Sequence, residues 1–556
     1  MGNPNTIPIA AYSIGNRTQG GYPATNPNRN YLTAAAYTPV TDSFPIEFTT
    51  MQSANGYHAF ASTHFEYKAY IAFKGGRAPY RVSVFGLPGA TIGASGNEQT
   101  MQRTLDAIGG GVYRHDFPTN FNTIRWTPTV DQIGSTFNVT ALVEDSSGKA
   151  AVQSFSVLVD NTKFIFVDGT VADDSGAGTW ASPKKTFAAA HVNNGKICAY
   201  KTAGTYAVTF GGLNNSDNLS RQHIGLVSGV VFDMTSQQFG CSTKSDDVAF
   251  INIEFNGSVV SNANCRVFNM SGKTDNAIWW GCRWRNVSVG TNSGDNPGCV
   301  AMMSLGNPPG TNGATGVGNV RDLPDAYSHR NITFAENDGD ITVHSQLFMI
   351  FGGVGVCAEK NTCRYPVPYI SGSVNSNGAQ FIHLKDGCSR VAVRFNVCAG
   401  GAFSIAAISF SNQRAFWCYQ QEASYNIIKW SDAAGISFNR QATVDGDTLQ
   451  GQRKNAEDTR CIRNTCISTI DGAMEFARWE GAGGTNQPVI VEGNLVATTN
   501  ANILTPNTIA DGGATLVGVN AKLSASDFDA NMKLTGAARV THLGKQGAEI
   551  ASTLVT

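Results

Sequence analysis

The sequence predicts an all-β protein whose largest part is a parallel β-helix, a solenoid of stacked coils. Many short apolar strands follow one another after about residue 195, with no helices between them. One unit recurs among them: a strand ends in Asn, and a second short apolar strand follows. Eight copies place this Asn at positions 256, 286, 331, 361, 396, 426, 464 and 494, so that the intervals are 30, 45, 30, 35, 30, 38 and 30 residues. A basal period near 30 residues with loop insertions is typical of a solenoid.

The recurring Asn suits the corner of a coil. Asn tolerates the left-handed backbone conformation better than other non-glycine residues do. Asn side chains that stack one above another also hydrogen-bond from coil to coil. A β-propeller is the alternative repeat fold, but each of its blades needs four strands in about 40–45 residues and often carries a Trp-Asp signature. Neither feature is evident, so the β-helix is preferred.

The composition excludes several classes of protein. At 556 residues the chain is too long for one ordinary core, and two to four domains are expected unless part of it is a repeat structure. The 40 basic and 41 acidic residues nearly cancel, so bulk charge gives no attraction to nucleic acid. No segment reaches the ~18 uninterrupted apolar residues of a membrane helix, so no membrane insertion is expected.

The 12 cysteines lie between Cys198 and Cys466 and form no C-x-x-C pair. They therefore lack the spacing of a zinc site or a thiol redox motif. Several lie in apolar strand-like runs such as WWGCRW and RFNVCAG, which is typical of buried free thiols. We expect synthesis in a reducing cytoplasm, no metal and no other cofactor.

The N-terminal part divides into an arm and a β-rich module. Residues 1–45 are rich in Asn, Pro and Tyr without periodicity and are expected to form an extended arm or linker. Residues 46–162 alternate between apolar and polar positions, as in YRVSVFGL and AVQSFSVLVD, with turn signals between the runs. The order GGRAPYRVSVFGLPG, IRWTPT and FNVTALVEDSSGKAAVQSFSVLV resembles bacterial immunoglobulin-like domains of the putative-Ig class. The positions that carry the resemblance are Gly75, Gly76, Pro79, Tyr80, Gly86, Leu87, Pro88, Asp145 and Gly148. The resemblance implies an Ig-like β-sandwich that spaces or binds and has no evident catalytic residues.

At about residue 163 the chain starts again with a strand, an Asp- and Gly-rich turn, Trp-x-Ser-Pro and a short Ala-rich segment. The open first coil of a solenoid needs a cover for its apolar interior. We expect a helix over SPKKTFAAAH with Ser182 as N-cap and Pro183 as its first residue. Phe187 is expected to close the end of the barrel. The Asp-rich turn lacks the order of an EF-hand and is interpreted as a turn without a metal.

This opening motif, followed by about 300 residues of Asn-cornered coils, resembles bacteriophage tailspike depolymerases, which are pectin-lyase-like right-handed β-helices. The positions that match are Val167, Asp168, Gly169, Asp173, Asp174, Ser175, Gly176, Gly178, Trp180, Pro183, Lys185, Thr186 and Ala189. The resemblance implies a right-handed β-helix over 163–500 and a small C-terminal β domain over 501–556 that caps the helix and helps to form a homotrimer. It also implies a virion protein, made in the cytoplasm of a bacterial host, that joins the phage tail or baseplate through its N-terminal side and binds bacterial surface polysaccharide.

Candidate site residues come from five aligned segments: DITVHSQLF, QFIHLKDG, AFSIAAIS, GISFNRQ and AMEFARWEG. Alternate residues of a strand point to opposite faces. Apolar residues of these segments are expected to face the core: Ile382, Leu384, Phe403, Ile405, Ile436, Phe438, Met474 and Phe476. The polar residues between them then form an outward column: Thr342, His344, His383, Lys385, Ser404, Ser437, Asn439, Glu475 and Arg478.

Carboxylates on such a face suit glycoside hydrolysis, which needs two carboxyl groups about 5–9.5 Å apart. Asp386 and Glu475 are the expected acid/base pair, with Glu480 and Glu422 in reserve; Glu422 falls on a different strand of its coil. His344 and His383 are expected to orient substrate or to act as a lyase base. Lys385, Arg440 and Arg478 are expected to hold a uronate, and Trp430, Trp479 and Tyr425 are expected to stack on sugar rings.

Three functions remain open at this stage. Hydrolysis of O-antigen or capsule by a carboxylate pair is preferred. β-Elimination is the enzyme alternative, which needs a uronic acid and a basic residue such as His383 or Lys385. A receptor-binding fibre or adhesin without catalysis is the third. Since every catalytic candidate follows residue 335, the module of residues 46–162 is expected to be dispensable for cleavage.

Overall fold

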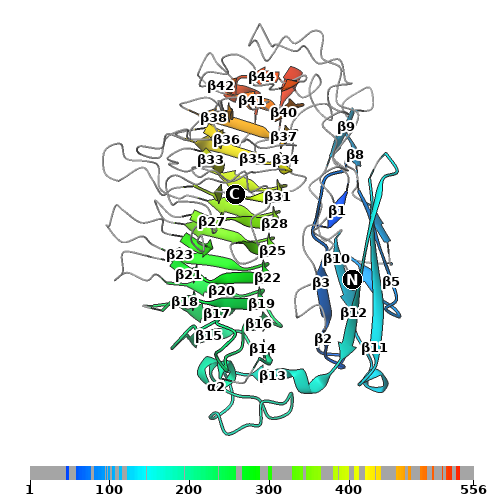
Figure 1. Cartoon of the computed structure of the whole chain (residues 1–556), viewed down its shortest axis with the longest axis vertical. Helices are drawn as coiled ribbons and strands as arrows, with labels where there is room; N and C mark the ends of the chain where they lie inside the picture. Colours follow the sequence, from blue (N-terminus) through cyan, green and yellow to red (C-terminus); the bar gives the residue numbers. More distant parts are fainter. Residues whose placement is uncertain are drawn as a thin grey trace, which may run out of the picture.

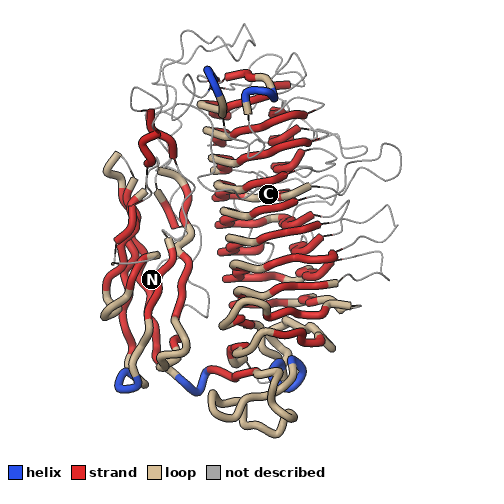
Figure 2. Tube along the Cα trace, turned by 180° about the vertical axis from the view of Figure 1, so that it is seen from behind, coloured by secondary structure: helices blue, strands red, loops and turns tan. Residues whose placement is uncertain are grey.

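The computed structural model of the chain describes the residues 46–48, 58–76, 80–93, 96, 98–100, 103–106, 112–115, 122–145, 147–192, 195–235, 237–257, 266–287, 298–302, 328–341, 346–364, 380–385, 387–399, 406–411, 420–431, 434–439, 459–469, 474–476, 489–497, 504–505, 516–517, 521–528 and 534–538. These residues form two bodies that lie side by side (Figure 1, Figure 2). One is the N-terminal module of antiparallel sheets. The other is a tall stack of short strands that belong to three long parallel sheets, as the β-helix prediction requires.

Every strand of the three helix sheets pairs in parallel with the strand one coil earlier and one coil later. Sheet 1 has twelve strands. They are β13 (Phe164–Val167), β14 (Ile197–Tyr200), β16 (Gln222–Gly225), β19 (Lys244–Ile251), β22 (Lys273–Trp280), β25 (His329–Ala335), β28 (Gly353–Glu359), β31 (Ser389–Arg394), β34 (Gln421–Ser424), β37 (Thr459–Ile462), β40 (Val489–Glu492) and β43 (Leu516–Val517).

Sheet 2 follows sheet 1 around each coil and has eleven strands. They are β15 (Gly204–Ala207), β17 (Val230–Asp233), β20 (Glu254–Asn256), β23 (Arg283–Val287), β26 (Asp338–Ile341), β29 (Thr362–Arg364), β32 (Val397–Ala399), β35 (Ile427–Ser431), β38 (Thr465–Thr469), β41 (Leu495–Ala497) and β44 (Ala521–Leu523).

Sheet 3 completes the coil and has nine strands. They are β18 (Phe239–Cys241), β21 (Arg266–Met270), β24 (Gly298–Met302), β27 (Gln346–Phe351), β30 (Ile382–Lys385), β33 (Ala406–Ser411), β36 (Ala434–Asn439), β39 (Met474–Phe476) and β42 (Leu504–Thr505). The coils continue past residue 500, because β42, β43 and β44 extend all three sheets. The boundary expected at residue 500 is therefore too early, since the Asn signal stops one coil before the strands do.

The interior of the coils is a single apolar column. In-register pairing places similar residues above one another, so that the rings of Phe410 and Phe438 stack at 4.5 Å and those of Phe239 and Phe268 at 4.9 Å. The ten cysteines in the described part of the chain are all buried and free, as expected. Burial raises the pKa of the Cys198 thiol to about 12, so it remains a protonated thiol.

An asparagine ladder runs up the corner between sheets 1 and 2. Its members are Asn337, Asn361, Asn396, Asn426, Asn464 and Asn494. Each Nδ2 donates to the Oδ1 of the next Asn at 2.9–3.0 Å, and each also donates to a backbone carbonyl of an earlier coil or of its own preceding strand. The predicted coil-to-coil bonding of stacked Asn side chains is confirmed from Asn361 onward.

Two details of the predicted corner are wrong. Asn256, Asn286 and Asn331 lie in strands rather than at this corner; Asn286 donates to Asn256, and Asn331 donates to Asn276. The left-handed backbone expected at the recurring Asn is confirmed at Asn286 and Asn331, with φ of 52° and 56°, but in the ladder it belongs to the residue before the Asn. These preceding residues are Glu336, Lys360, Phe395, Tyr425 and Arg463, with φ of 52–57°. The ladder Asn is needed for its hydrogen bonds, not for its backbone conformation.

Replacing Asn396 by alanine is expected to lower the free energy of unfolding by about 3 kcal/mol, because it leaves several buried polar groups without a hydrogen-bond partner. Asn396 accepts from the backbone and side chain of Asn361 and donates to the carbonyl of Ala358. Urea denaturation measures the loss. Asn138→Ala is the matched control, because Asn138 is exposed in strand β11 and has no left-handed backbone, and it should cost less than about 1 kcal/mol. Equal losses in the two variants would contradict a role for the ladder in stability.

The opening motif closes the first coil. Helix α2 (Phe187–His191) begins later than expected, with Thr186 as N-cap rather than Ser182. The reason is that Lys184 bridges to strand β13, since its N–H donates to the carbonyl of Phe166 and its own carbonyl accepts from Asp168. Asp174 then fixes the approach to the helix by accepting from the backbone N–H groups of Lys185 and Thr186 at 2.7 and 2.9 Å. Phe187 is fully buried at the end of the interior, as predicted.

A chain of buried polar rings lies beneath this helix. His191 Nδ1 and His223 Nε2 are 3.2 Å apart, and the Tyr200 hydroxyl is 3.1 Å from His223 Nδ1. Burial lowers the pKa of His191 to about 4. Burial, with His191 nearby, lowers that of His223 well below 6.5. Both rings are therefore neutral in the folded chain at neutral pH.

Acid is expected to destabilise the chain between about pH 6.5 and pH 4. In that pH window the histidines of the unfolded chain become protonated, near pH 6.5, while those of the folded chain stay neutral. The free energy of unfolding therefore has its full value above the window and decreases as the pH is lowered through it. Each histidine should contribute a loss of about 2 kcal/mol between about pH 7 and pH 5. The slope of unfolding free energy against pH is the measurement. His191→Gln should reduce the slope, whereas His64→Gln, at an exposed position, should not. An unchanged slope in His191→Gln would contradict the assignment.

The N-terminal module contains two sheets that share one core. The larger sheet has the order β2 (His58–Ala59), β12 (Ala150–Val159), β11 (Thr136–Glu144), β5 (Arg81–Phe85) and β7 (Glu98–Thr100). The smaller has the order β3 (Tyr67–Tyr70), β10 (Thr123–Trp126) and β6 (Thr91–Ile92). Two further pairs are β1 (Glu47–Phe48) with β4 (Phe73–Lys74), and β8 (Arg103–Asp106) with β9 (Val112–His115). Alternate residues of β5, β10 and β11 are buried between the two larger sheets, as the sequence alternation predicts.

The module covers the outer face of sheet 1. Tyr70 and Ala72 of the module form one buried cluster with outward residues of sheet 1 such as Ile251, Ile278 and Trp280. Phe60 and Phe65 form another with Phe164 and Phe166 of β13 and with β14. Figures 1 and 2 show the module lying alongside the stack. Sheet 1 therefore needs the module as a cover, which argues against the expected dispensability of residues 46–162.

Charged groups are buried within this contact. Arg394 and Glu359 form a salt bridge at 2.8 Å and are 0% and 1% exposed. Glu359 also accepts from the Tyr70 hydroxyl and, at 2.9 Å, from Asn122, both of the module. The Arg394 guanidinium lies 4.2 Å from the centre of the Phe73 ring. Despite its burial, these partners hold the pKa of Glu359 below its ordinary value, so the pair is charged.

Candidate functional site on sheet 3

The structure describes the expected site residues to different extents. Glu475 lies in β39 and Trp430 in β35, of which the backbone is described. His383, Lys385 and Glu422 are described with their side chains. The remaining candidates lie outside the described residues: Asp386, Glu480, His344, Arg440, Arg478 and Trp479.

The predicted alternation on sheet 3 is confirmed where side chains are described. Ile382 and Leu384 of β30 and Ile436 and Phe438 of β36 belong to the interior of the coils. The intervening residues therefore face outward. Backbone register then stacks one outward column in coil order: Met349, His383, Ser409, Ser437, Glu475 and Thr505. A second column, two residues further along the strands, holds Phe351, Lys385, Ser411 and Asn439.

Facing outward does not make these side chains accessible. His383, Ser409 and Ser437 are 5%, 0% and 0% exposed. His383 Nε2 is 2.7 Å from the Ser411 hydroxyl, and burial, with Lys385 nearby, lowers the pKa of His383 to about 3. A buried neutral imidazole of this kind is a weak base. The expected roles of His383 as a substrate ligand or lyase base are therefore corrected to a structural hydrogen bond within the face.

Lys385 is the cation that this face presents among its described residues. It is half-buried, and its Nζ lies 4.9 Å from the centre of the Phe351 ring one coil earlier. The face of an aromatic ring attracts a cation electrostatically, so Phe351 helps to orient the Lys385 ammonium group on this face. The arrangement supports the expectation that Lys385 binds an anionic group of a ligand.

The expected pairing of Asp386 with Glu475 stays a prediction, because Asp386 lies outside the described residues. Asp386 directly follows Lys385 of β30, and Glu475 lies in β39, three coils later through β33 and β36. Three steps of about 4.8 Å separate these backbone positions by about 14 Å along the stack. Glycosidase carboxylates lie about 5–9.5 Å apart. The segments QFIHLKDG, GISFNRQ and AMEFARWEG do align on sheet 3. The other two segments were aligned wrongly, because DITVHSQLF begins in β26 of sheet 2 and the strand within AFSIAAIS begins at Ala406, so that Ser409 takes the place expected for Ser404.

Glu422 and Tyr425 have structural surroundings instead of a groove. Glu422 is 1% exposed, accepts from the Gly75 N–H at 3.1 Å and accepts from the Ser424 hydroxyl at 2.6 Å. Tyr425 stacks on Phe395 at 5.2 Å in the core shared with the module. Both residues therefore help to dock the module and are removed from the site. Trp430 belongs to sheet 2, so it lies on a different wall from Lys385 and Glu475.

Comparisons with known proteins add little to this geometry. No family model and no curated protein sequence matches the chain. A search of solved structures finds a likeness to the GH136 lacto-N-biosidase from Eubacterium ramulus, with 12% identity and a TM-score of 0.37 over 65% of this chain and 68% of that chain. A likeness this weak carries no argument about the fold or the activity of this chain. The three parallel sheets are established by the strand pairing itself.

The described residues contain neither a membrane-spanning helix nor a metal-binding cluster. No helix there is long and apolar enough to cross a bilayer, and no group of three or more His, Cys, Asp or Glu side chains is placed to hold a metal ion. Sequence reasoning did miss the residues at the contact with the module, above all Glu359 and Arg394. The signal for them was present, because both charged residues end apolar strands directly before an Asn corner, in VCAEKN and VAVRFN.

Proposed function

We propose that the chain is a phage tailspike that binds bacterial surface polysaccharide along the outer face of sheet 3 and cleaves it by hydrolysis. The observation that carries the proposal is the half-buried Lys385 on this face, in the column next to the one whose register contains Glu475. Residues of sheets 1 and 2 join buried clusters with the module, whereas no such cluster includes a described residue of sheet 3. Sheet 3 is thus the face left for a long ligand, and the resemblance of the opening motif to tailspikes supports a polysaccharide as that ligand.

Glu475 is the proposed catalytic carboxylate. Its partner is Glu480, which is five residues later in the sequence, whereas Asp386 follows a strand three coils earlier. One carboxyl group protonates the leaving oxygen of the glycosidic bond, while the other activates water or attacks the sugar. Lys385 binds an acidic sugar of the chain two to three coils earlier. Hydrolysis is preferred over β-elimination because His383, the nearest described base, is neutral and buried.

Glu475→Gln is expected to lower turnover of the purified O-antigen or capsule by about 10²-fold or more, the scale of lost acid–base catalysis. Polysaccharide binding and thermal stability should be nearly unchanged, because the substitution keeps the shape of the side chain. New reducing ends measure hydrolysis, and absorbance of unsaturated uronates measures elimination. Glu480→Gln should behave likewise, and the double variant should be little worse than either one.

Glu254→Gln, on sheet 2, is the matched control and should retain wild-type turnover. Near-normal turnover in both Glu475→Gln and Glu480→Gln would place the site on another wall. Saturable binding with no product of either kind in the wild type would favour the receptor-binding fibre.

The finer assignments belong to the same proposal. The β-helix is right-handed, the module is an Ig-like sandwich, and three chains assemble into a homotrimer in the virion. The N-terminal side joins the phage tail or baseplate. The resemblance to tailspikes supports these assignments, and exposed solenoid faces gain from burial in a closed assembly. Light scattering that finds a stable monomer at micromolar concentration would contradict the trimer.

A further inference from the structure

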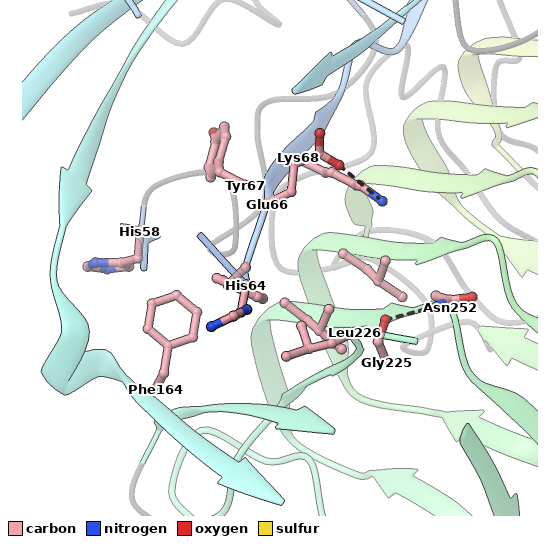
Figure 3. Close-up of a pocket in the computed structure, with 12 residues that line it drawn as sticks. His58, His64, Glu66, Tyr67, Lys68, Phe164, Gly225, Leu226 and Asn252 are labelled. Atoms are coloured by element: carbon pink, nitrogen blue, oxygen red, sulfur yellow. Dashed lines mark hydrogen bonds and ion pairs between the residues drawn. The ribbon is translucent and has the colours of Figure 1, made fainter. Parts of the chain in front are cut away.

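A pocket lies at the junction between the module and the first coils of the β-helix (Figure 3). It lies against sheet 1, whereas the polar columns lie on sheet 3. Its volume is about 180 Å³. At about 30 Å³ for each water, the pocket holds about six waters, which is room for one six-membered sugar ring but not for a chain of them. The residues that line it include His64, Glu66, Lys68, Leu226, Ile251 and Asn252.

The floor of the pocket is apolar. Leu226 and Ile251 come from two successive coils of sheet 1, and Phe65 and Phe164 form a wall in which their rings meet edge to face at 5.2 Å. Such a floor can pack against the apolar C–H face of a ring, and removing that face from water favours binding. It provides shape and hydrophobic contact, but the polar groups at the rim decide which ligand is accepted.

The rim offers hydrogen-bonding groups from both bodies. The Glu66 carboxylate lies 3.5 Å from Lys68 Nζ and 3.6 Å from Arg125 Nε, which are ion-pair distances that leave it able to accept shorter hydrogen bonds. Asn252 donates its two N–H groups to the carbonyls of Gly225 and Val227, so its Oδ1 is directed elsewhere. The Glu66 carboxylate therefore presents acceptors to a ligand with hydroxyl groups, and Lys68 Nζ beside it presents a donor.

The mouth of the pocket is held by the opening motif. The imidazole of His64 stacks on the Trp180 indole at 5.3 Å and an interplanar angle of 5°, and Lys201 lies on that same indole at 4.6 Å. Trp180 belongs to the Trp-x-Ser-Pro segment of the β-helix, whereas His64 belongs to the module. The site is therefore complete only when the two bodies are docked.

We propose that this junction pocket binds a single neutral pyranose ring. An apolar floor with acceptors at the rim matches a ring that has one C–H face and hydroxyl groups around its edge. The Glu66 carboxylate, shared between two cations, leaves no strong unpaired charge for an ionic ligand. That the ring is a residue of the bacterial polysaccharide rests on the proposed function, and the pocket then serves as an accessory subsite away from sheet 3.

The test uses the full chain and three free monosaccharides as probes: glucose, galactose and N-acetylglucosamine. Saturation-transfer NMR and isothermal titration measure binding. At least one probe should bind saturably and raise the melting temperature, because the ligand contacts both docked bodies. Leu226→Trp fills the pocket and should abolish binding. Glu66→Gln should weaken it about tenfold, the scale of one lost hydrogen bond to a charged group.

The controls separate this inference from the proposed function. Glu254→Gln and Glu475→Gln both lie outside the pocket and should bind the probe as the wild type does. Absence of saturable binding of all three probes, or equal binding by Glu66→Gln and wild type, overturns the inference even if Leu226→Trp fails to fold. Loss of probe binding in Glu475→Gln also overturns it, because the bound ring would then lie on sheet 3. A wild type that binds the probe but cleaves no polysaccharide overturns the proposed function and leaves the pocket in place.

Discussion

Arg394→Met is expected to lower the free energy of unfolding by about 3–5 kcal/mol, because it leaves Glu359 buried without its cation. The pair is fully enclosed between β28, β31 and the module, and its bond is 2.8 Å long. Without the guanidinium, burial should raise the pKa of Glu359, so that the carboxyl group takes up a proton at neutral pH. Chemical denaturation measures the loss, and the change should be larger at high pH than at low pH.

Two variants make this result specific. Arg285→Met is the matched control: its ion pair with Asp338 is 2.6 Å long but 24% and 29% exposed, and its loss should cost about 1 kcal/mol or less. The double variant Arg394→Met with Glu359→Gln should recover part of the loss, because it removes the uncompensated charge. A cost for Arg394→Met no larger than that for Arg285→Met would show that the buried pair does not hold the two bodies together.

A chain that begins at Asn161, without the module, is expected to be insoluble or aggregated. Truncation would expose the outward faces of Ile251, Ile278 and Trp280, which now form one cluster with Tyr70 and Ala72. It would also open the second cluster around Phe164 and Phe166. Contiguous apolar surface of this kind leads to association in solution. Sedimentation and recovery of soluble protein after expression are the measurements.

Removal of residues 1–45 is the control for this truncation, because it leaves the described part of the module in place. That chain should stay soluble and keep the melting temperature of the full chain. A soluble, folded chain beginning at Asn161 would show instead that sheet 1 does not need its cover, and it would restore the expectation that the module is dispensable.

The repeat of Asn and short strands was sufficient to predict the β-helix, because a solenoid repeats one local geometry. Alternation likewise gave the correct inward residues, such as Ile382 and Phe438. It could not give what lies against the other face, which depends on contacts far apart in sequence. His383 was therefore expected to meet substrate, although it is buried, and Glu422 was expected near a groove, although Gly75 of the module covers it.

The opening motif shows the same limit on a smaller scale. Ser182 and Pro183 have the local chemistry of a helix start, but the bridge between Lys184 and β13 holds the chain extended until Thr186. Local preference was overruled by pairing with a strand about 17 residues earlier. Likewise, the distance between Asp386 and Glu475 depends on how many coils intervene, which becomes certain only when the register of each strand is known.

The asparagine ladder has a direction. Each carboxamide from Asn337 to Asn464 donates to the Asn of the next coil, so the five side-chain hydrogen bonds of the ladder all point the same way along the stack. Hydrogen bonds in such a series polarise one another, by about 10–30% for each bond. The ladder therefore behaves as one cooperative series of hydrogen bonds along the corner between sheets 1 and 2. Replacing an Asn in its middle should weaken hydrogen bonds several coils away, whereas replacing its last Asn should not.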